Sequence, residues 1–358
     1  MAKGERKWWL IICLLLFAIF LFAAPYRIRE ETVLDSRWIT SLESESLAEP
    51  GSLSEEFVPF ILGDRFGYIG QNGRFAINQT LNAYVSMSET YWAQYEPLPF
   101  NMQVMNLQNE SIFVFEQPWG YPVFLDNRIY IVGSEQNSIT LISQGGEELW
   151  TYDFPAPLTC IDAHGGYFLG GTLDGTVILL NSLGSPVFIP FEPGGSNLSV
   201  ILGCAISKDA SRLALISGID EQRFLLMERA GDNYRVVYHE FLGSGFRRPV
   251  HISFADDDSK IIFEREGGLG IYSIGSRRSI NLSLEGEIVT LDNSGEDGFL
   301  FLITSQSQND KRLVTIKYPG HVVSQAPFKS DNTFLARRGS KIYLGGDTAI
   351  ALFEIERQ

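Results

Sequence analysis

The 358 residues carry a net charge of −15, and 13% of them are aromatic, so the chain has the apolar material for a packed core and is not disordered by default. A body this acidic repels phosphate, which disfavours non-specific binding to nucleic acid or to anionic lipid headgroups. The length does not by itself require two domains, because folds built from repeated β-strands often exceed the usual domain size.

The chain starts with a basic stretch and 17 uncharged residues from Trp8 to Ala24, which span roughly 25 Å as a helix. Such a pattern predicts a signal-anchor or transmembrane helix within residues 1–25 that crosses the membrane through residues 8–24. A cleaved signal peptide and a lipoprotein acylated at Cys13 are the alternatives. The basic N-terminus predicts a single-pass protein with its C-terminal body outside the cytoplasm, in the bacterial periplasm.

Residues 26–56 are acidic and rich in serine, which predicts a juxtamembrane linker. Within them, TVLDSRWITSL (Thr32 to Leu42) has the β-branched and aromatic residues of a strand. The last repeat of the chain shows only three strands. We therefore expect Thr32–Leu42 to donate the strand that completes this repeat, with a plain linker as the alternative.

From residue 57 onward a hairpin pattern recurs. Its second-strand pieces read DRFGYIG, NRIYIVG, GGYFLGG, SRLALIS, SKIIFER, DGFLFLI and SKIYLGG. From Ile129 to Ile342 these pieces lie about 43 residues apart on average, which is the period of a four-stranded propeller blade. The sequence predicts an all-β protein, a seven-bladed β-propeller of four-stranded antiparallel blades over residues 57–358, preceded by one N-terminal transmembrane helix.

Several of these repeats resemble known propeller families. GGEELWTYDF and GGTLDGTVILLN look like the repeats of quinoprotein-like propellers, a group that includes the bacterial lipoprotein that assists outer-membrane protein assembly. AISKDASRLALIS and ISFADDDSKIIFE look more like WD40-type repeats, in which an Asp-rich turn precedes an apolar strand. The resemblance covers roughly residues 57 to 358 and implies the propeller fold at superfamily level.

One spacing departs from the period, because Phe66 and Ile129 lie 63 residues apart. We interpret the excess as an insertion near residues 82–122. Its density of Tyr, Trp, Met and Pro is typical of residues at the centres of protein interfaces. The candidate protein-binding residues are Tyr91, Trp92, Tyr95, Trp119 and Tyr121. The alternative is that these aromatic side chains cap the propeller's own core.

The sequence offers little sign of catalysis. It has no GxSxG elbow, no Walker loop and no HExxH motif, and its four histidines are scattered, so no catalytic, cofactor-binding or metal-ligating residue is proposed. The adjacent cysteines of quinone-dependent relatives are absent, and no cofactor is expected. Cys160 and Cys204 are expected to be two buried thiols with a packing role.

The leading hypothesis is therefore a membrane-anchored propeller outside the cytoplasm, a non-enzymatic scaffold that binds another envelope or secreted protein. The alternative is a propeller that binds a small ligand, or acts as a quinoprotein-like enzyme, in its central channel. A third hypothesis, a eukaryotic membrane glycoprotein, depends on four Asn-x-Ser/Thr triplets, at Asn78, Asn109, Asn197 and Asn281.

Overall fold

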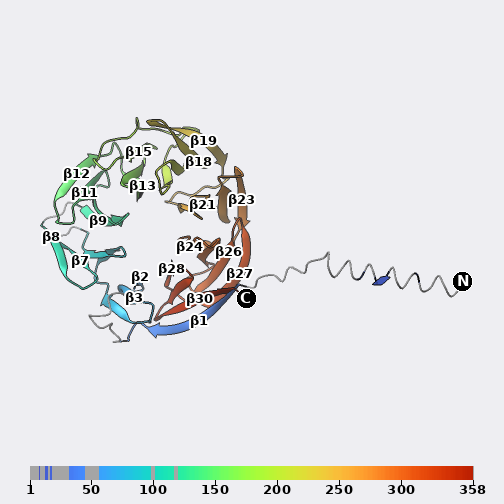
Figure 1. Cartoon of the computed structure of the whole chain (residues 1–358). Helices are drawn as coiled ribbons and strands as arrows, with labels where there is room; N and C mark the ends of the chain where they lie inside the picture. Colours follow the sequence, from blue (N-terminus) through green and yellow to red (C-terminus); the bar gives the residue numbers. More distant parts are fainter. Residues whose placement is uncertain are drawn as a thin grey trace.

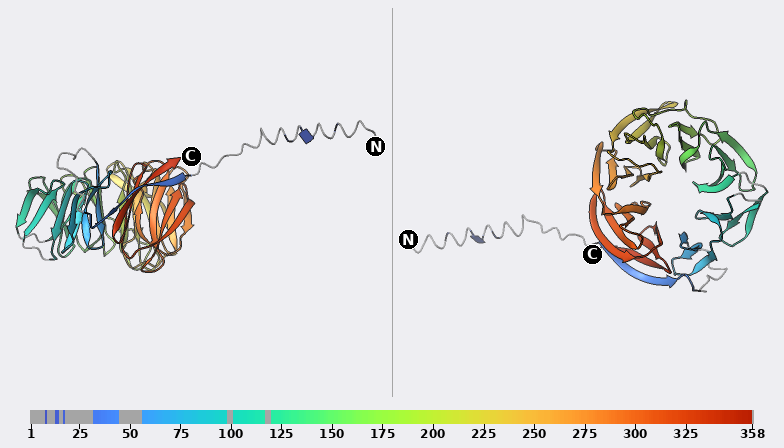
Figure 2. Two further views of the ribbon diagram at one scale, coloured as in Figure 1. Left: turned by 90° about the horizontal axis from the view of Figure 1, so that it is seen from below. Right: turned by 180° about the vertical axis from the view of Figure 1, so that it is seen from behind.

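The computed structural model describes residues 32–44, 56–97, 101–116 and 120–357, together with the single residues 8, 13, 14 and 17. The thirty strands of these residues form eight antiparallel sheets (Figure 1). The sheets are arranged as blades around a central opening, and together they form a thick disc when seen from the edge (Figure 2). Chain order is blade order, so each blade packs mainly on its neighbours in sequence.

The first four blades are built as follows. Blade 1 contains β2 (Phe57–Leu62), β3 (Arg65–Gly70) and β4 (Phe75–Thr80). Blade 2 contains β5 (Tyr84–Met87), β6 (Tyr91–Tyr95), β7 (Asn101–Asn106) and β8 (Ser111–Glu116). Blade 3 contains β9 (Gly120–Leu125), β10 (Arg128–Gly133), β11 (Ser138–Ile142) and β12 (Glu148–Asp153). Blade 4 contains β13 (Leu158–His164), β14 (Tyr167–Thr172) and β15 (Val177–Leu180).

The other four blades have four strands each. Blade 5 contains β16 (Ile201–Ile206), β17 (Arg212–Ser217), β18 (Arg223–Ala230) and β19 (Asn233–Phe241). Blade 6 contains β20 (Ile252–Ala255), β21 (Lys260–Arg265), β22 (Gly268–Ser273) and β23 (Arg278–Ser283). Blade 7 contains β24 (Glu287–Asp292), β25 (Phe299–Ser305), β26 (Asp310–Lys317) and β27 (His321–Lys329). Blade 8 contains β28 (Thr333–Arg338), β29 (Lys341–Gly346), β30 (Ala349–Arg357) and β1 (Thr32–Ser41).

The predicted count of seven blades is wrong, and the structure has eight. The stretch expected to be an insertion contributes the whole of blade 2, from Tyr84 to Glu116. The second strand of this blade is centred near Trp92, which lies 26 residues after Phe66 and 37 before Ile129. The long spacing therefore contains two repeats, the first of them short because blade 1 has three strands.

Blade 8 is assembled from the two ends of the described chain. Strand β1 lies antiparallel to β30, with register from Leu34 opposite Ile355 to Ser41 opposite Ala349. The side chain of Arg37 on β1 binds two carboxylates of β30, those of Glu354 and Glu356, each at 2.8 Å. This pairing closes the ring, because it gives the last blade its outer strand and covers the edge of β30.

The core lies between the blades as a series of apolar clusters. Phe224 of blade 5 stacks on Phe263 of blade 6 with ring centres 4.7 Å apart, and both side chains are fully buried. Between blades 4 and 5, Cys204 is buried and Cys160 packs against the same cluster, and both are free thiols. A hydrogen bond with the Cys160 thiol, together with burial, raises the pKa of Cys204.

Carboxylates on innermost strands connect neighbouring blades. Asp162 of β13 accepts hydrogen bonds from the backbone N–H of Ile206 in blade 5 (2.8 Å) and from that of Ala163 (2.9 Å). In the same way, Asp292 of β24 accepts from the backbone N–H of Arg337 in blade 8 (2.8 Å). Burial raises the pKa of the Asp162 carboxyl from its ordinary 3.8 to about 6, even though these hydrogen bonds favour the charged form.

The raised pKa of Asp162 predicts a dependence of stability on pH. The stability that the protonated Asp162 carboxyl contributes to the folded state is fully present below the unfolded-state pKa of 3.8, and it is lost as pH rises through about 6. Asp162→Asn removes this titration. The unfolding free energy of the variant, relative to the wild type, should therefore rise by up to roughly 3 kcal/mol between pH 4 and pH 7. Urea unfolding of both proteins at each pH measures this difference, and a flat difference would contradict the prediction.

The predicted membrane segment, residues 8–24, lies outside the described residues apart from four single positions. Within the part of the chain that the structure describes, no helix is long and apolar enough to cross a membrane. This finding corrects the predictions of an N-terminal transmembrane helix and of a single-pass membrane protein. The uncharged run was already short for that purpose, since about 25 Å of helix falls below a hydrocarbon core of ~30 Å.

Candidate functional site

Blade 2 is split along its middle. Its strands β6 and β7 pair at only two positions, Tyr91 with Asn106 and Trp92 with Met105. Beyond this point the remainder of β6 stays paired with β5, and the remainder of β7 stays paired with β8. The two hairpins of the blade therefore diverge, and the sheet opens between them.

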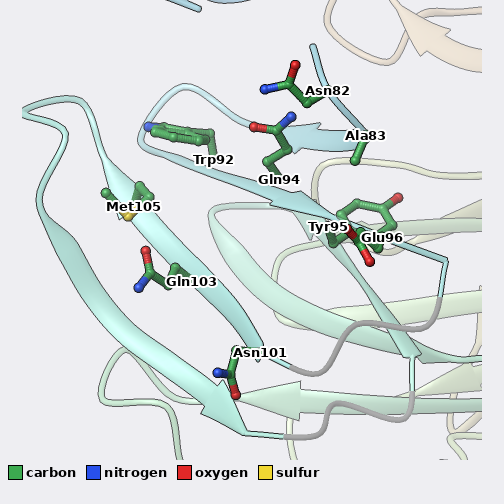
Figure 3. Close-up of a pocket in the computed structure, with 9 residues that line it drawn as sticks. All are labelled: Asn82, Ala83, Trp92, Gln94, Tyr95, Glu96, Asn101, Gln103 and Met105. Atoms are coloured by element: carbon green, nitrogen blue, oxygen red, sulfur yellow. The ribbon is translucent and has the colours of Figure 1, made fainter. Parts of the chain in front are cut away.

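A cavity of about 580 Å³ lies at this opening (Figure 3). Its volume is within the usual range for ligand pockets. It is lined by residues from the loop before β5, from β6 and the residue after it, and from β7, namely Asn82, Ala83, Trp92, Gln94, Tyr95, Glu96, Asn101, Gln103 and Met105. We call it the blade 2 pocket.

The pocket lies on the face of blade 2 that looks toward blade 1. Trp92 packs on Phe66 of β3 with ring centres 5.2 Å apart, and Met105 contacts the same apolar cluster. Side chains alternate between the two faces of a strand, so Gln94 shares this face with Trp92, and Gln103 shares it with Met105. The pocket is thus lined by alternate residues of the two diverging strands, β6 and β7.

Most of the pocket lining is polar without being charged. Four of the nine lining residues are Asn or Gln, and the carboxylate of Glu96 is the one charged group among the nine. When the carboxamide of Gln94 is turned so that its oxygen faces the turn before β5, this oxygen accepts from the backbone N–H groups of Asn82 (2.8 Å) and Ala83 (3.2 Å). Carboxamides both donate and accept hydrogen bonds, so the lining suits a neutral or cationic polar ligand such as a peptide.

The structure separates two of the predicted binding residues, Tyr91 and Trp92, onto opposite faces of β6. Tyr91 is half-buried toward blade 3, with its ring 6.2 Å from that of Phe124. Trp92 is only 6% exposed, and its indole N–H donates to the carbonyl of Asn106 at 3.1 Å. Trp92 is therefore a core residue whose edge reaches the pocket.

The structure brings Tyr95 and Tyr121 together. The ring of Tyr95 lies between those of Tyr84 and Tyr121, at centre distances of 5.9 and 6.2 Å, in a stack that joins blades 2 and 3. Burial raises the pKa of Tyr121. Tyr84 is the exposed end of the stack. The remaining candidate, Trp119, lies outside the described residues.

Sequence reasoning missed the polar part of the site. The binding residues predicted from the sequence are all aromatic. They do not include Tyr84 or the four Asn and Gln residues that line the pocket. A signal was present, since polar and apolar residues alternate in AQYE and NMQV. In the part of the chain that the structure describes, no group of three or more His, Cys, Asp or Glu side chains is placed to hold a metal ion.

Comparison with known proteins identifies the family. A family model described as a β-propeller protein matches residues 1–358. The chain belongs to the β-propeller proteins. An uncharacterized protein of Treponema pallidum (strain Nichols) is 23% identical to this chain over 360 residues, covering 98% of this chain and 95% of the relative.

Three solved structures are similar to this chain at 12% sequence identity. BamB from Moraxella catarrhalis has a TM-score of 0.58, with 90% of this chain and 100% of BamB covered. Apo AztD from Citrobacter koseri has a TM-score of 0.57, with 81% and 88% covered. The computationally designed Ika8 protein has a TM-score of 0.59, with 88% and 99% covered. These likenesses concern the fold, and they confirm the predicted resemblance to the quinoprotein-like propeller of the outer-membrane assembly lipoprotein.

Proposed function

We propose that this β-propeller protein is a non-enzymatic protein-binding module whose contact surface surrounds the blade 2 pocket. The observation that supports the proposal most is the join between blades 1 and 2. There a polar cavity of about 580 Å³ lies beside the exposed apolar side chains of Ile112 and Val114, and the exposed Tyr84, at the end of the tyrosine stack on the opposite face of blade 2, directly follows the lining residue Ala83. Apolar residues next to polar hydrogen-bonding groups are typical of protein interfaces.

The rest of the molecule supports this role by holding the surface still. The hydroxyl of Tyr68 in blade 1 donates to two carbonyls of blade 2, those of Ser88 (2.8 Å) and Tyr91 (2.9 Å). The tyrosine stack fixes the other side of blade 2 on blade 3. A surface held in one conformation loses little entropy when a partner binds.

The experiment compares two double variants of the full chain as bait in extracts of the source cells. Tyr84→Ser/Val114→Ser should lose at least one protein that the wild type enriches, because it strips exposed apolar contacts from the proposed surface. Leu149→Ser/Phe241→Ser is the matched control, since these side chains are as exposed but lie on the outer strands of blades 3 and 5. Quantitative mass spectrometry of the eluates measures the loss.

Trp92 is left intact in this design because it belongs to the core. Both double variants should melt within a few degrees of the wild type, since all four substituted side chains are largely exposed. Equal capture of every protein by the wild type and by Tyr84→Ser/Val114→Ser would contradict the proposed surface.

A further inference from the structure

Blade 1 lacks the outer strand that most blades have. Its third strand, β4, pairs with β3 on one edge and with no other strand among the described residues. An uncovered strand edge presents backbone N–H and C=O groups to any segment that can pair with it. As far as the described residues go, blade 1 therefore has an open position for a fourth strand.

Blade 4 shows how the chain covers the same kind of edge elsewhere. Blade 4 also has three strands, but the segment that follows β15 folds back along it. Val177 and Phe191 exchange two backbone hydrogen bonds, of 2.9 and 3.2 Å, and the N–H of Val187 donates to the carbonyl of Leu179 at 2.8 Å. Among the described residues, β4 has no such cover.

The blade 2 pocket lies near this open position, because its lining residue Asn82 follows β4 by two residues and Met105 packs on the apolar cluster that contains Ile77 of β4. Blade 1 covers the part of the facing sheet where Trp92 meets Phe66 and where Met105 of β7 packs, but it leaves side chains of the outermost strand β8 exposed. On β8, the side chains of Ile112 and Val114 are 38% and 49% exposed. Val114 pairs with Gln103 in the sheet register, so both side chains point to the side of the pocket.

We propose that the pocket receives an extended segment of a partner polypeptide, which adds to β4 as the fourth strand of blade 1. This inference rests on the proposed protein-binding function and specifies its partner. Backbone hydrogen bonds to β4 would supply affinity, and alternate side chains of the segment would face blade 2. Ile112 and Val114 favour apolar residues at one end of the segment, while Glu96 favours a basic residue near the carboxamides.

The edges of the opening are fixed before any partner arrives. At one end, the side chain of Gln79 on β4 donates to Asn109 in the turn between β7 and β8, at 3.3 Å. At the other end, the Gln94 carboxamide, with its oxygen turned toward the loop before β5, accepts from two backbone N–H groups of that loop. A six-residue segment alongside β4 would be about 20 Å long, which matches the strands on either side.

The test uses a labelled synthetic peptide that copies Asn233–Phe241, the outer strand of blade 5, because it has a strand sequence with one arginine. Fluorescence anisotropy with the full chain should show saturable binding. Hydrogen exchange should slow at least tenfold at residues 75–80 and stay unchanged in the other blades. Gln103→Trp, which fills the pocket, should weaken peptide binding at least tenfold. Leu149→Trp, at an exposed outer-strand position of blade 3, should bind as the wild type does.

Several results would overturn the strand-addition model. The first is that the peptide does not bind at millimolar concentration. The second is that the peptide slows hydrogen exchange at sites other than β4, and the third is that the Gln103→Trp variant binds the peptide as tightly as the wild type does. Slow exchange of β4 in the free monomer would show that the chain covers its own edge. Slow exchange that appears only as the chain dimerises would make a second copy the occupant. If Tyr84→Ser/Val114→Ser loses a captured protein while β4 stays unprotected, the protein-binding function stands and strand addition falls.

Discussion

Replacing Arg337 with alanine is expected to lower the free energy of unfolding by about 3–5 kcal/mol, because the change leaves the partly buried carboxylate of Asp297 without its counter-charge and removes the donors to two carbonyls. The Arg337 side chain is 1% exposed, and it lies between blades 7 and 8. It pairs with Asp297 at 2.6 Å, and it donates to the carbonyls of Phe299 (2.9 Å) and Gly339 (2.8 Å). Its guanidinium also lies over the ring of Phe301. Chemical unfolding followed by tryptophan fluorescence measures the loss.

The neighbouring residue provides the control. Arg338 also pairs with a carboxylate, that of Glu89 at 2.6 Å, but Glu89 is largely exposed to solvent. Exposed ion pairs contribute roughly 0–1 kcal/mol, so Arg338→Ala should cost less than about 1 kcal/mol. Equal losses for Arg337→Ala and Arg338→Ala would show that burial of the ion pair at the join of blades 7 and 8 has little effect on stability.

Removing β1 is the second change with a large expected effect. A chain that starts at residue 45 lacks the outer strand of blade 8, together with Trp38, which packs on Tyr343 at 6.1 Å, and the buried side chain of Leu42. Each buried apolar side chain of this size contributes about 1.5–3 kcal/mol. The truncation should therefore lose several kcal/mol of stability and expose the edge of β30 to association.

A chain that starts at residue 32 is the matched control, because it keeps β1 and removes only the residues before it. Thermal unfolding and sedimentation of the two truncations measure stability and association together. Two truncations with the same melting temperature, both monomeric, would mean that β1 adds little to ring closure.

The repeat could be predicted from sequence wherever the second strand of a blade is a continuous apolar run. The seven runs identified by their hairpin pattern correspond to β3, β10, β14, β17, β21, β25 and β29, the second strand of every blade except blade 2. These strands are buried on both faces between neighbouring blades, and such burial requires apolar residues at successive positions. The propeller family was predictable for that reason, and the comparisons confirm it.

Blade 2 escaped prediction because its second strand, YWAQY, interrupts the apolar run with Gln94. The side chain at this position is polar because it faces the pocket and not the apolar core between blades. Gln94, which lines the candidate site, thus also breaks the apolar run by which the other blades can be recognised. The predicted number of blades was therefore one too low. The high content of aromatic residues in this region is visible in the sequence. The positions of their side chains, however, depend on the residue at which β6 and β7 stop pairing, and no local sequence pattern specifies that residue.

The shared last blade also constrains how the molecule can fold during synthesis. Most contacts in the ring join strands that are adjacent in the chain, and such hairpins can form as the residues emerge. Strand β1 is different, because its partner Ala349–Arg357 is made more than 300 residues later. Until then β1 has no ladder to join, so closure is the last and slowest step, governed by the entropy of bringing two distant ends together. A chaperone that covers β1 during synthesis would therefore be expected to raise the yield of closed rings.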